Sequence, residues 1–352
     1  MDIKSLLKRM KQIGASDLHL VTGIPPAFRI NGNLKFSKED EVLTPEKIES
    51  VVRFLLNEKQ WALLKEKKDL DFSYGISGIG RFRINIHYQR GSLAAAIRLI
   101  PYDIPSLEEL NLPDVIEKLC LKDRGLILVT GPTGSGKSTT LAAMIDIINR
   151  RRSAHIIIIE DPIEYLHSHK KSVVEQREIG GDSNSFADSL KYCLRQDPDV
   201  IMIGEMRDLE TISTALTAAE TGHLVMGTLH TPDAPGAIDR IIDVFPPYQQ
   251  SQIRLQLSTC LVAVIAQTLI PRADNNGRVP AVEILIGTPA VGNLIRSSKT
   301  HQLYNIMQTS LDIGMQTIDQ SLLYLVRNKL ITKEVALQRA RDPRMLEEAL
   351  SK

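Results

Sequence analysis

Eight consecutive residues, Gly131-Pro132-Thr133-Gly134-Ser135-Gly136-Lys137-Ser138, fit the pattern G-x-x-x-x-G-K-[ST] of a phosphate-binding P-loop. In such a loop the backbone N–H groups and the N-terminus of the following helix bind phosphate oxygens. We expect Lys137 to reach the β- and γ-phosphates of ATP and the Ser138 hydroxyl to bind Mg²⁺. Thr139, the next residue, completes the set that we expect at the nucleotide.

The stretches on both sides of the loop favour this interpretation. Residues 126–129 form a short apolar run that predicts a buried strand. Residues 139–150 carry Leu141, Ile145 and Ile148 at helical spacing. A strand, a glycine-rich turn and a helix are the context in which a P-loop works.

Polar residues follow three further apolar runs, and they predict a hydrolytic site. Glu164 comes shortly after the run 156–159, Glu205 follows the run 200–203, and His230 ends the run that starts at Leu224. Because ligands bind at the carboxyl ends of parallel strands, we expect these side chains near the P-loop.

Nucleotide hydrolysis needs a carboxylate near Mg²⁺ and a polar group that orients the attacking water. Glu205 stands where a Walker B acid is expected, although Gly204 replaces the more usual Asp. Glu164 is the candidate for polarising the water, and His230 for sensing the γ-phosphate. Any one of these acids alone could be a helix cap or a surface carboxylate; together with Lys137, they predict at least one catalytic acid.

Arginines alternate with apolar residues in a separate part of the chain. Arg81 and Arg83 fall on one face of an expected strand over residues 81–88, and Arg98 falls on its expected hairpin partner over 93–100. Such residues are usually solvated surface, but a cluster in a separate domain could supply an arginine finger. Their spacing leaves both interpretations open.

Composition excludes several classes of protein. The chain has 352 residues and a formal net charge of +1, without the basic character of a dedicated nucleic-acid-binding protein. Its three cysteines lie far apart, which excludes a four-cysteine zinc site and favours reduced thiols in a cytosolic protein. The apolar window 261–270 is too short to span a bilayer, so we expect any membrane role to go through a partner.

Changes of hydrophobic period predict an α/β fold with several parts. Residues 1–100 read as an α+β unit with one helical stretch over 45–67, and residues 101–123 as a proline-punctuated linker. Residues 124–289 alternate strands and helices, as a parallel sheet covered on both faces would. Residues 290–352 read as helices.

The motifs together resemble the secretion ATPase superfamily of type II secretion, type IV secretion and type IV pili, and within it the PilT-type retraction ATPases. The matching segments are the P-loop, Ala15-Ser16-Asp17-Leu18-His19-Leu20, the acidic segment 160–164, the atypical Walker B segment 194–208 and the histidine-bearing segment 221–231. The resemblance covers essentially the whole chain. It implies a hexameric ring, with a PAS-like N-terminal domain followed by a RecA-like ATPase domain.

The resemblance also implies roles for the candidate residues. ATP would lie between the two domains, with Arg83 and Arg98 reaching it, Glu164 as catalytic base, and Glu205 acting on Mg²⁺ and water. The ring would be cytoplasmic and peripheral at the inner membrane, where it would pull on a platform protein so that pilin subunits leave the fibre.

One segment departs from the retraction subgroup. Asn293-Leu294-Ile295-Arg296 matches its C-terminal motif, but Gly292 and Ser297 replace a charged pair. Two alternatives therefore stay open beside the retraction motor. One is a related secretion-type ATPase for DNA uptake or protein export, and the other is an adaptor that binds ATP and hydrolyses it weakly.

Overall fold

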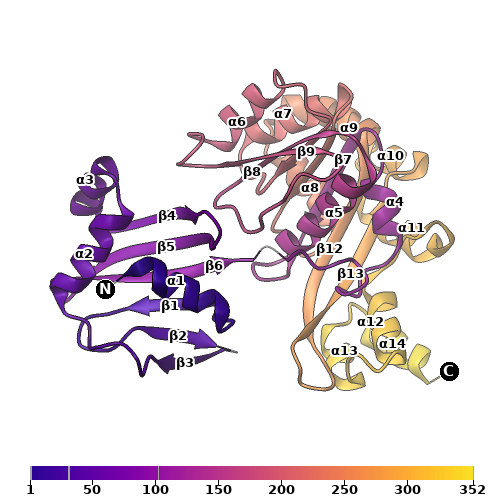
Figure 1. Cartoon of the computed structure of the whole chain (residues 1–352). Coiled ribbons are helices and arrows are strands. Elements are labelled where there is room, and N and C mark those ends of the chain that lie inside the picture. Colours follow the sequence, from indigo (N-terminus) through magenta and orange to yellow (C-terminus); the bar gives the residue numbers. More distant parts are fainter. Residues whose placement is uncertain (1, 31, 102, 352) are drawn as a thin grey trace. The chain divides into compact units, whose positions relative to one another are not determined.

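The chain divides into two compact units, Met1–Asp103 with Pro162–Leu166, and Ile104–Asp161 with His167–Lys352. The structure, a computed structural model, describes residues 2–30, 32–101 and 103–351. Figure 1 shows the helices and strands of each unit. The predicted α/β class is confirmed, with a parallel sheet in the larger unit and helices in the C-terminal part.

The first unit is built on a six-stranded antiparallel sheet in the order β3-β2-β1-β6-β5-β4. Its strands are β1 (Asp17–Leu20), β2 (Ala27–Ile30), β3 (Asn33–Phe36), β4 (Asp69–Ile76), β5 (Gly80–Gln89) and β6 (Ser92–Ile100). The expected hairpin of β5 and β6 is confirmed, with Arg90 and Gly91 at its turn. The sequence pattern does not predict β2, β3 and β4.

Three helices supply apolar side chains to the core of this unit: α1 (Ile3–Gln12), α2 (Pro45–Leu55) and α3 (Glu58–Lys67). Alternate residues of β5, namely Phe82, Ile84 and Ile86, are buried in that core. The intervening positions, Arg81 and Arg83 among them, therefore lie on the other face of the sheet, as expected.

The prediction of a single helix over residues 45–67 is wrong, because two helices, α2 and α3, cover this stretch. The backbone of Leu56 is extended, and Asn57 starts a new helix as its N-cap. Asn57 Oδ1 accepts a hydrogen bond from Gln60 N, and Gln60 Oε1 accepts one from Asn57 N. This reciprocal capping box makes a helix start here more stable than a continuous helix.

The second unit contains a seven-stranded sheet in the order β13-β12-β7-β11-β10-β8-β9. All neighbouring strands pair in parallel except β12 and β13. The strands are β7 (Gly125–Thr130), β8 (His155–Glu160), β9 (Val173–Glu178), β10 (Val200–Ile203), β11 (Leu224–Thr228), β12 (Leu261–Pro271) and β13 (Arg278–Ile286). The continuous apolar runs of β7, β8, β10 and β11 are thus parallel strands, as predicted.

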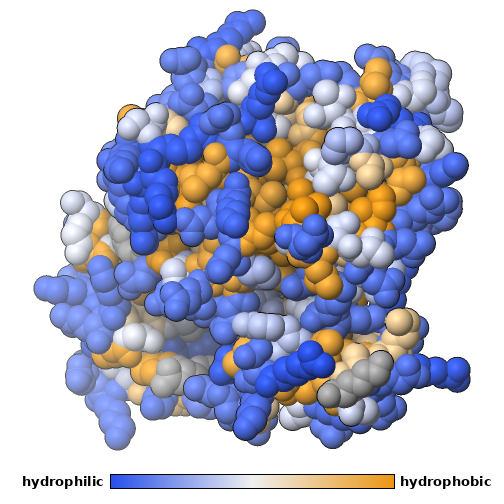
Figure 2. Space-filling model, turned by 90° about the vertical axis from the view of Figure 1, so that its right-hand side faces the viewer, coloured by the Kyte–Doolittle hydropathy of each residue, from blue (hydrophilic) through white to orange (hydrophobic). Residues whose placement is uncertain are grey.

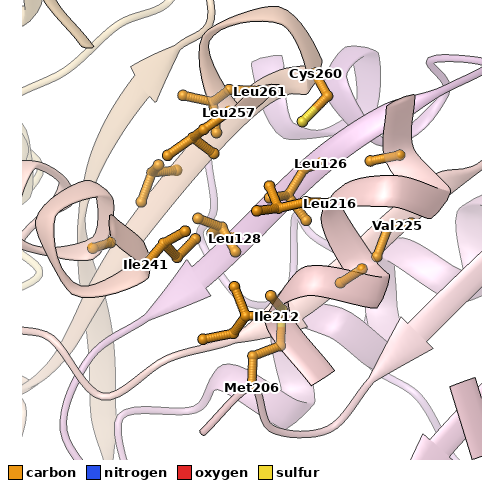
Figure 3. Packing of buried hydrophobic residues seen from close by; sticks show 14 of the residues in the cluster. Leu126, Leu128, Met206, Ile212, Leu216, Val225, Ile241, Leu257, Cys260 and Leu261 are labelled. Carbon is orange, nitrogen blue, oxygen red and sulfur yellow. The ribbon is translucent and has the colours of Figure 1, made fainter. Parts of the chain in front are cut away.

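Helices cover both faces of this sheet. They are α4 (Val115–Cys120), α5 (Lys137–Arg151), α6 (Phe186–Cys193), α7 (Leu209–Glu220), α8 (Ala234–Asp243) and α9 (Pro247–Cys260). Figure 3 shows Leu126 and Leu128 of β7 packed near Ile212 and Leu216 of α7. Ile127, between those two leucines, belongs to a second core with residues of α4 and α5. Burial on both faces explains why these strands lack alternation.

The hairpin of β12 and β13 is long, and the sequence pattern does not predict it. Ile270 of β12 and Val279 of β13 pack in a separate cluster with Leu322 and Leu325. The helices after the hairpin are α10 (Pro289–Arg296), α11 (Leu303–Thr309), α12 (Ile318–Arg327), α13 (Lys333–Arg339) and α14 (Pro343–Leu350). The expected helical C-terminal part is confirmed, and the hairpin is packed against it.

The stretch expected as a linker, residues 101–123, belongs largely to the second unit. From Ile104 onward it is grouped with that unit, and Leu107, Leu112, Ile116 and Leu119 are buried in its core. Tyr102 lies outside the described residues.

Among the described residues, no helix has the length and hydrophobicity needed to cross a bilayer. Figure 2 shows apolar side chains on one face of the molecule, surrounded by hydrophilic ones.

The cysteines Cys120, Cys193 and Cys260 are free and buried, and burial raises the pKa of the Cys120 and Cys260 thiols to about 12.

Candidate active site

The P-loop connects the end of β7 to the start of α5, as the sequence predicts. Gly136 is the N-cap of α5 and has a φ of 89°, in the left-handed region that glycine adopts without strain. Because glycine has no side chain, no side-chain hydrogen bond caps the helix. The N–H groups of its first turn, at Lys137, Ser138 and Thr139, are therefore suited to bind an anion.

Lys137 lies over the loop that precedes it. Its Nζ donates hydrogen bonds to Gly131 O at 2.8 Å and to Pro132 O at 3.1 Å, and the residue is 9% exposed. Pro132, Thr133 and Gly134 are exposed at the crest of the loop, whereas Ser135 is buried. The structure thus brings the predicted residues Gly131 to Thr139 together as one loop and one helix turn.

Glu205 and His230 meet at the ends of neighbouring strands. Glu205 follows β10, His230 follows β11, and His230 Nε2 lies 2.8 Å from Glu205 Oε1. The Arg207 guanidinium forms an ion pair with the same carboxylate oxygen. The side chain of Glu205 is 20% exposed, so this carboxylate is partly shielded from water but still accessible.

The glycine in place of the usual Walker B aspartate has a steric explanation. A β-carbon on Gly204 would lie 3.2 Å from Ile159 O and 3.3 Å from the Cα of Glu160. Such contacts are tighter than most side chains make, so a larger residue at this position would push the end of β8 away by a few tenths of an ångström. The acid is therefore carried by Glu205 alone, as the sequence predicts.

Two threonines tie these strand ends to the P-loop strand. Thr130 Oγ1, at the end of β7, donates to Thr231 O at 2.8 Å and accepts from Thr231 N at 2.9 Å. Thr228 Oγ1 donates to Gly204 O. The P-loop strand, the His230 segment and the Glu205 segment are consequently one hydrogen-bonded unit.

Gln267 of β12 is a site residue that the sequence pattern does not single out as functional. It is 3% exposed, and its Nε2 donates to Ser135 O at 2.6 Å. Thr140 Oγ1 donates to Gln267 Oε1 at 2.8 Å. The available signal was a polar amide within an apolar strand, because a buried amide needs hydrogen-bond partners.

A cavity of about 400 Å³ opens beside the first turn of α5. It is polar where the chain folds back at the tip of the β12–β13 hairpin and apolar at Leu269 and Pro280. Its lining residues include Gly136, Thr139, Thr140, Gln267, Leu269, Arg272, Asp274, Asn276, Arg278 and Pro280. This mixture of surfaces suits an organic group attached to the bound phosphates.

In the first unit, Arg83 lies directly opposite Arg98 in the ladder of β5 and β6. Each arginine is paired with a different acid: Arg98 Nε lies 2.8 Å from Asp17 Oδ1, and Arg83 Nη2 lies 2.5 Å from Asp71 Oδ2. Although burial raises the pKa of Asp17, hydrogen bonds from Arg98 and Ser16 hold it below its ordinary value. The acids keep two facing positive charges compatible with a folded sheet.

Asp17 belongs to the segment Ser16-Asp17-Leu18-His19, for which the sequence alone suggests no role. Its Oδ2 accepts from Ser16 Oγ at 2.8 Å and lies 3.9 Å from Arg29 Nε. Asp17 therefore orients arginines on the exposed face of this sheet.

Glu164 is exposed and lies in the stretch Pro162–Leu166, which is grouped with the first unit. Its role as a catalytic base stays a prediction.

Gly292, where the chain departs from the retraction subgroup, lies on α10 against α9. A β-carbon at this position would be 2.9 Å from Ser258 O. Arg296 Nη1 donates to Ser258 Oγ at 3.1 Å. The glycine therefore allows a close approach of two helices that a larger residue would prevent.

A strand, P-loop and helix, with an acid and a histidine at neighbouring strand ends, define a P-loop ATPase. The family model described as Type II/IV secretion system protein matches residues 3–305, and the chain belongs to this family.

Individual relatives are similar over nearly their whole length. The chain is 47% identical to the Type IV pilus retractation ATPase PilT of Pseudomonas aeruginosa, over 97% of this chain and 99% of that one. It is 49% identical to a twitching motility protein of Neisseria gonorrhoeae, over 90% and 84% respectively. It is 44% identical to the Type IV pilus ATPase PilU of Pseudomonas aeruginosa, over 97% and 89%.

Solved structures agree with these relatives. The crystal structure of the pilus retraction motor PilT with bound ADP has 52% identity and a TM-score of 0.91, covering 99% of both chains. The ATPase DotB of Legionella pneumophila has 27% identity and a TM-score of 0.83, covering 96% of this chain and 94% of that one. The predicted resemblance to PilT-type ATPases and the prediction of an ATP-hydrolysing enzyme are confirmed.

Proposed function

We propose that this chain is the ATPase motor that retracts a type IV pilus and so drives twitching motility. The observation that carries the proposal is its 47% identity, over 97% of its length, to a protein named as a pilus retraction ATPase. In this proposal it works as a homo-hexamer in the cytoplasm, peripheral to the inner membrane, and pulls on a platform protein of the pilus machine.

ATP fits the P-loop of this chain. The first turn of α5 has no side-chain cap, and Lys137 is held within the loop by carbonyl oxygens that a phosphate would compete with. Lys137 would bind the β- and γ-phosphates, the N–H groups of residues 134–139 would bind phosphate oxygens, and the nucleoside would extend past Thr139 into the adjacent cavity.

The proposed site offers oxygen donors of the kind that Mg²⁺ binds. It prefers oxygen ligands, and it usually keeps several waters and takes phosphate oxygens rather than a full set of protein ligands. Among the described residues, no group of three His, Cys, Asp or Glu side chains is placed to hold a metal alone. The Ser138 hydroxyl and the Glu205 carboxylate would hold the ion, which would neutralise charge on the phosphates.

The remaining candidates would complete hydrolysis. Glu164 would orient and deprotonate the attacking water, and His230 would sense the γ-phosphate through its contact with Glu205. Arg83 and Arg98 would supply positive charge to the transferred phosphoryl group from the exposed face of their sheet. Movement of the smaller domain relative to the ATPase domain would then transmit force.

The test is deletion of the gene in the strain that encodes this chain. Loss of twitching with an excess of surface pili is expected, because fibres would assemble without being withdrawn. Restoration by the wild-type gene but not by a Lys137→Ala version would tie the effect to ATP. Normal piliation and normal twitching in the deletion strain would contradict the proposal.

A second candidate is an accessory pilus ATPase that acts beside a main retraction motor. The observation behind this alternative is the 44% identity, over 97% of this chain, to PilU, which is named as a type IV pilus ATPase without mention of retraction. An accessory role predicts that the deletion strain keeps nearly normal piliation while its twitching is reduced.

A further inference from the structure

We infer that Gln267 is a positioning residue that holds the P-loop in its phosphate-binding shape and thereby sets the affinity for nucleotide. The inference rests on the proposed ATPase function of this site. It assigns a task to a strand that does not carry any of the nucleotide-binding residues predicted from motifs.

The side-chain amide of Gln267 bridges two parts of the P-loop. Its Nε2 donates to Ser135 O within the loop, and its Oε1 accepts from Thr140 Oγ1 in the first turn of α5. Gly136, the N-cap of the helix, lies between these two contacts along the chain. One amide therefore fixes the geometry of the turn from both sides.

The loop also packs directly on the backbone and side chain of this residue. A β-carbon on Gly131 would lie 2.2 Å from Gln267 O, and one on Gly136 would lie 2.8 Å from Gln267 Nε2. The backbone of β12 therefore requires glycine at position 131, and a side chain at position 136 would displace the Gln267 amide. The fit leaves the loop little freedom to take another shape.

The strand that carries Gln267 is itself held firmly. The preceding residue, Ala266, pairs with Thr130 of β7 on one side and with Glu283 of β13 on the other. Ile270, farther along β12, is buried against the C-terminal helices. A side chain on such a support can hold a binding loop in position before the ligand arrives.

The two hydrogen bonds of Gln267 stabilise this conformation of the P-loop. Gln267 is 3% exposed, so each of its polar groups loses free energy if it has no partner. Both partners are present in the loop conformation of this structure, in which no side chain caps the first N–H groups of α5. Gln267 therefore reduces the ordering that ATP binding would otherwise require.

Replacement of Gln267 by leucine tests this idea. The P-loop contacts phosphate both in the bound substrate and in the transition state, so its loosening removes uniform binding. In Gln267→Leu we expect KM for ATP to rise about tenfold while kcat stays within about twofold of wild type. The Kd for a fluorescent ADP analogue is expected to rise by the same factor of about ten.

Two further variants, Gln267→Glu and Thr140→Val, and one control distinguish a loss of the hydrogen bonds from a general loss of stability. Gln267→Glu keeps the shape and an acceptor for Thr140, but it has no donor for Ser135 O, and we expect it also to weaken ADP binding. Thr140→Val removes one of the two hydrogen bonds and should give an intermediate Kd. Thr268→Val, at the next position on the opposite face of the strand, should leave Kd and KM unchanged.

The outcomes separate this inference from the proposed function. A folded Gln267→Leu and Gln267→Glu with wild-type Kd and KM would overturn the inference, even if their melting temperatures fell. If Gln267→Leu does not fold, the Kd values of Gln267→Glu and Thr140→Val decide it. A wild-type protein that binds ADP but releases no phosphate would contradict the proposed motor, while the ratio of Kd values would still decide the role of Gln267.

Discussion

His230 Nε2 lies 2.8 Å from Oε1 of Glu205, so the histidine after β11 and the acid after β10 form a direct pair. Arg207 contacts the same oxygen, which leaves Glu205 with two cationic or polar partners on one side. A γ-phosphate that draws His230 away would change the position of Glu205. If Glu205 holds Mg²⁺ as proposed, the pair would link the state of the nucleotide to that carboxylate.

Replacement of His230 should therefore lower catalysis more than binding. In His230→Ala we expect kcat for ATP hydrolysis to fall about tenfold or more, with little change in the Kd for ADP. His155 offers a matched control, because it also pairs with an acid, at 3.3 Å from Glu175, but it starts β8 at the opposite edge of the sheet. His155→Ala with a loss of kcat as large as that of His230→Ala would contradict this assignment.

The facing arginines of the first unit should matter for hydrolysis. If Arg83 and Arg98 stabilise charge on the phosphoryl group, each alanine variant should lose about 100-fold or more in kcat. Arg29 faces Asp17 from the other neighbouring strand, with its Nε 3.9 Å from Asp17 Oδ2, so Arg29→Ala is the control and should stay near wild type. Steady-state phosphate release measures all three, and equal small effects would indicate that these side chains are only solvated surface.

His167, which is partly buried, should make stability depend on pH. Burial lowers its pKa to about 4 from an ordinary value of 6.5, beside Asp146 and Lys170. Between these values the unfolded chain binds a proton that the folded chain does not. The contribution of His167 to the free energy of unfolding is therefore fully present above pH 6.5 and is lost as the pH falls toward about 4. The loss is about 3 kcal/mol.

The measurement is the free energy of unfolding by denaturant at several pH values. His167→Phe should lose this part of the pH dependence, because a phenyl ring takes up no proton. An unchanged slope between pH 4 and pH 6.5 in that variant would show that another group causes it.

Gly292→Ala should destabilise the protein, although alanine is the better helix former by about 1 kcal/mol. The new methyl group would meet Ser258 O at 2.9 Å, so α10 would have to move away from α9. We expect a net loss of about 1 kcal/mol in the free energy of unfolding. Asn293→Ala, at an exposed position of the same helix, is the control and should be neutral or slightly stabilising. A stabilising effect of Gly292→Ala would contradict the close approach of α10 to α9.

The local sequence predicts an element correctly where neighbouring residues determine its structure. The apolar run 126–129, the glycines of the P-loop and the periodic residues after it predicted β7, the loop and α5 closely. The same holds for the hairpin in which Arg83 faces Arg98. Hydrophobic periodicity and turn residues carry this information within a short window.

Features that depend on distant parts of the chain were harder to predict. Gln267 reaches the P-loop only because β12 pairs with β7, and no local pattern reports that pairing. The contact between Glu205 and His230 depends on side-chain geometry at two strand ends, although their common edge was predicted. The break at Asn57 did have a local signal, the capping pair with Gln60, but the apolar period runs through it.

The central claim is that the P-loop and Glu205 make this chain a working ATPase, and steady-state phosphate release tests it most directly. We predict that wild type hydrolyses ATP and that Lys137→Ala and Glu205→Gln each lose about 100-fold or more of this rate. Equal rates in all three proteins would contradict the account.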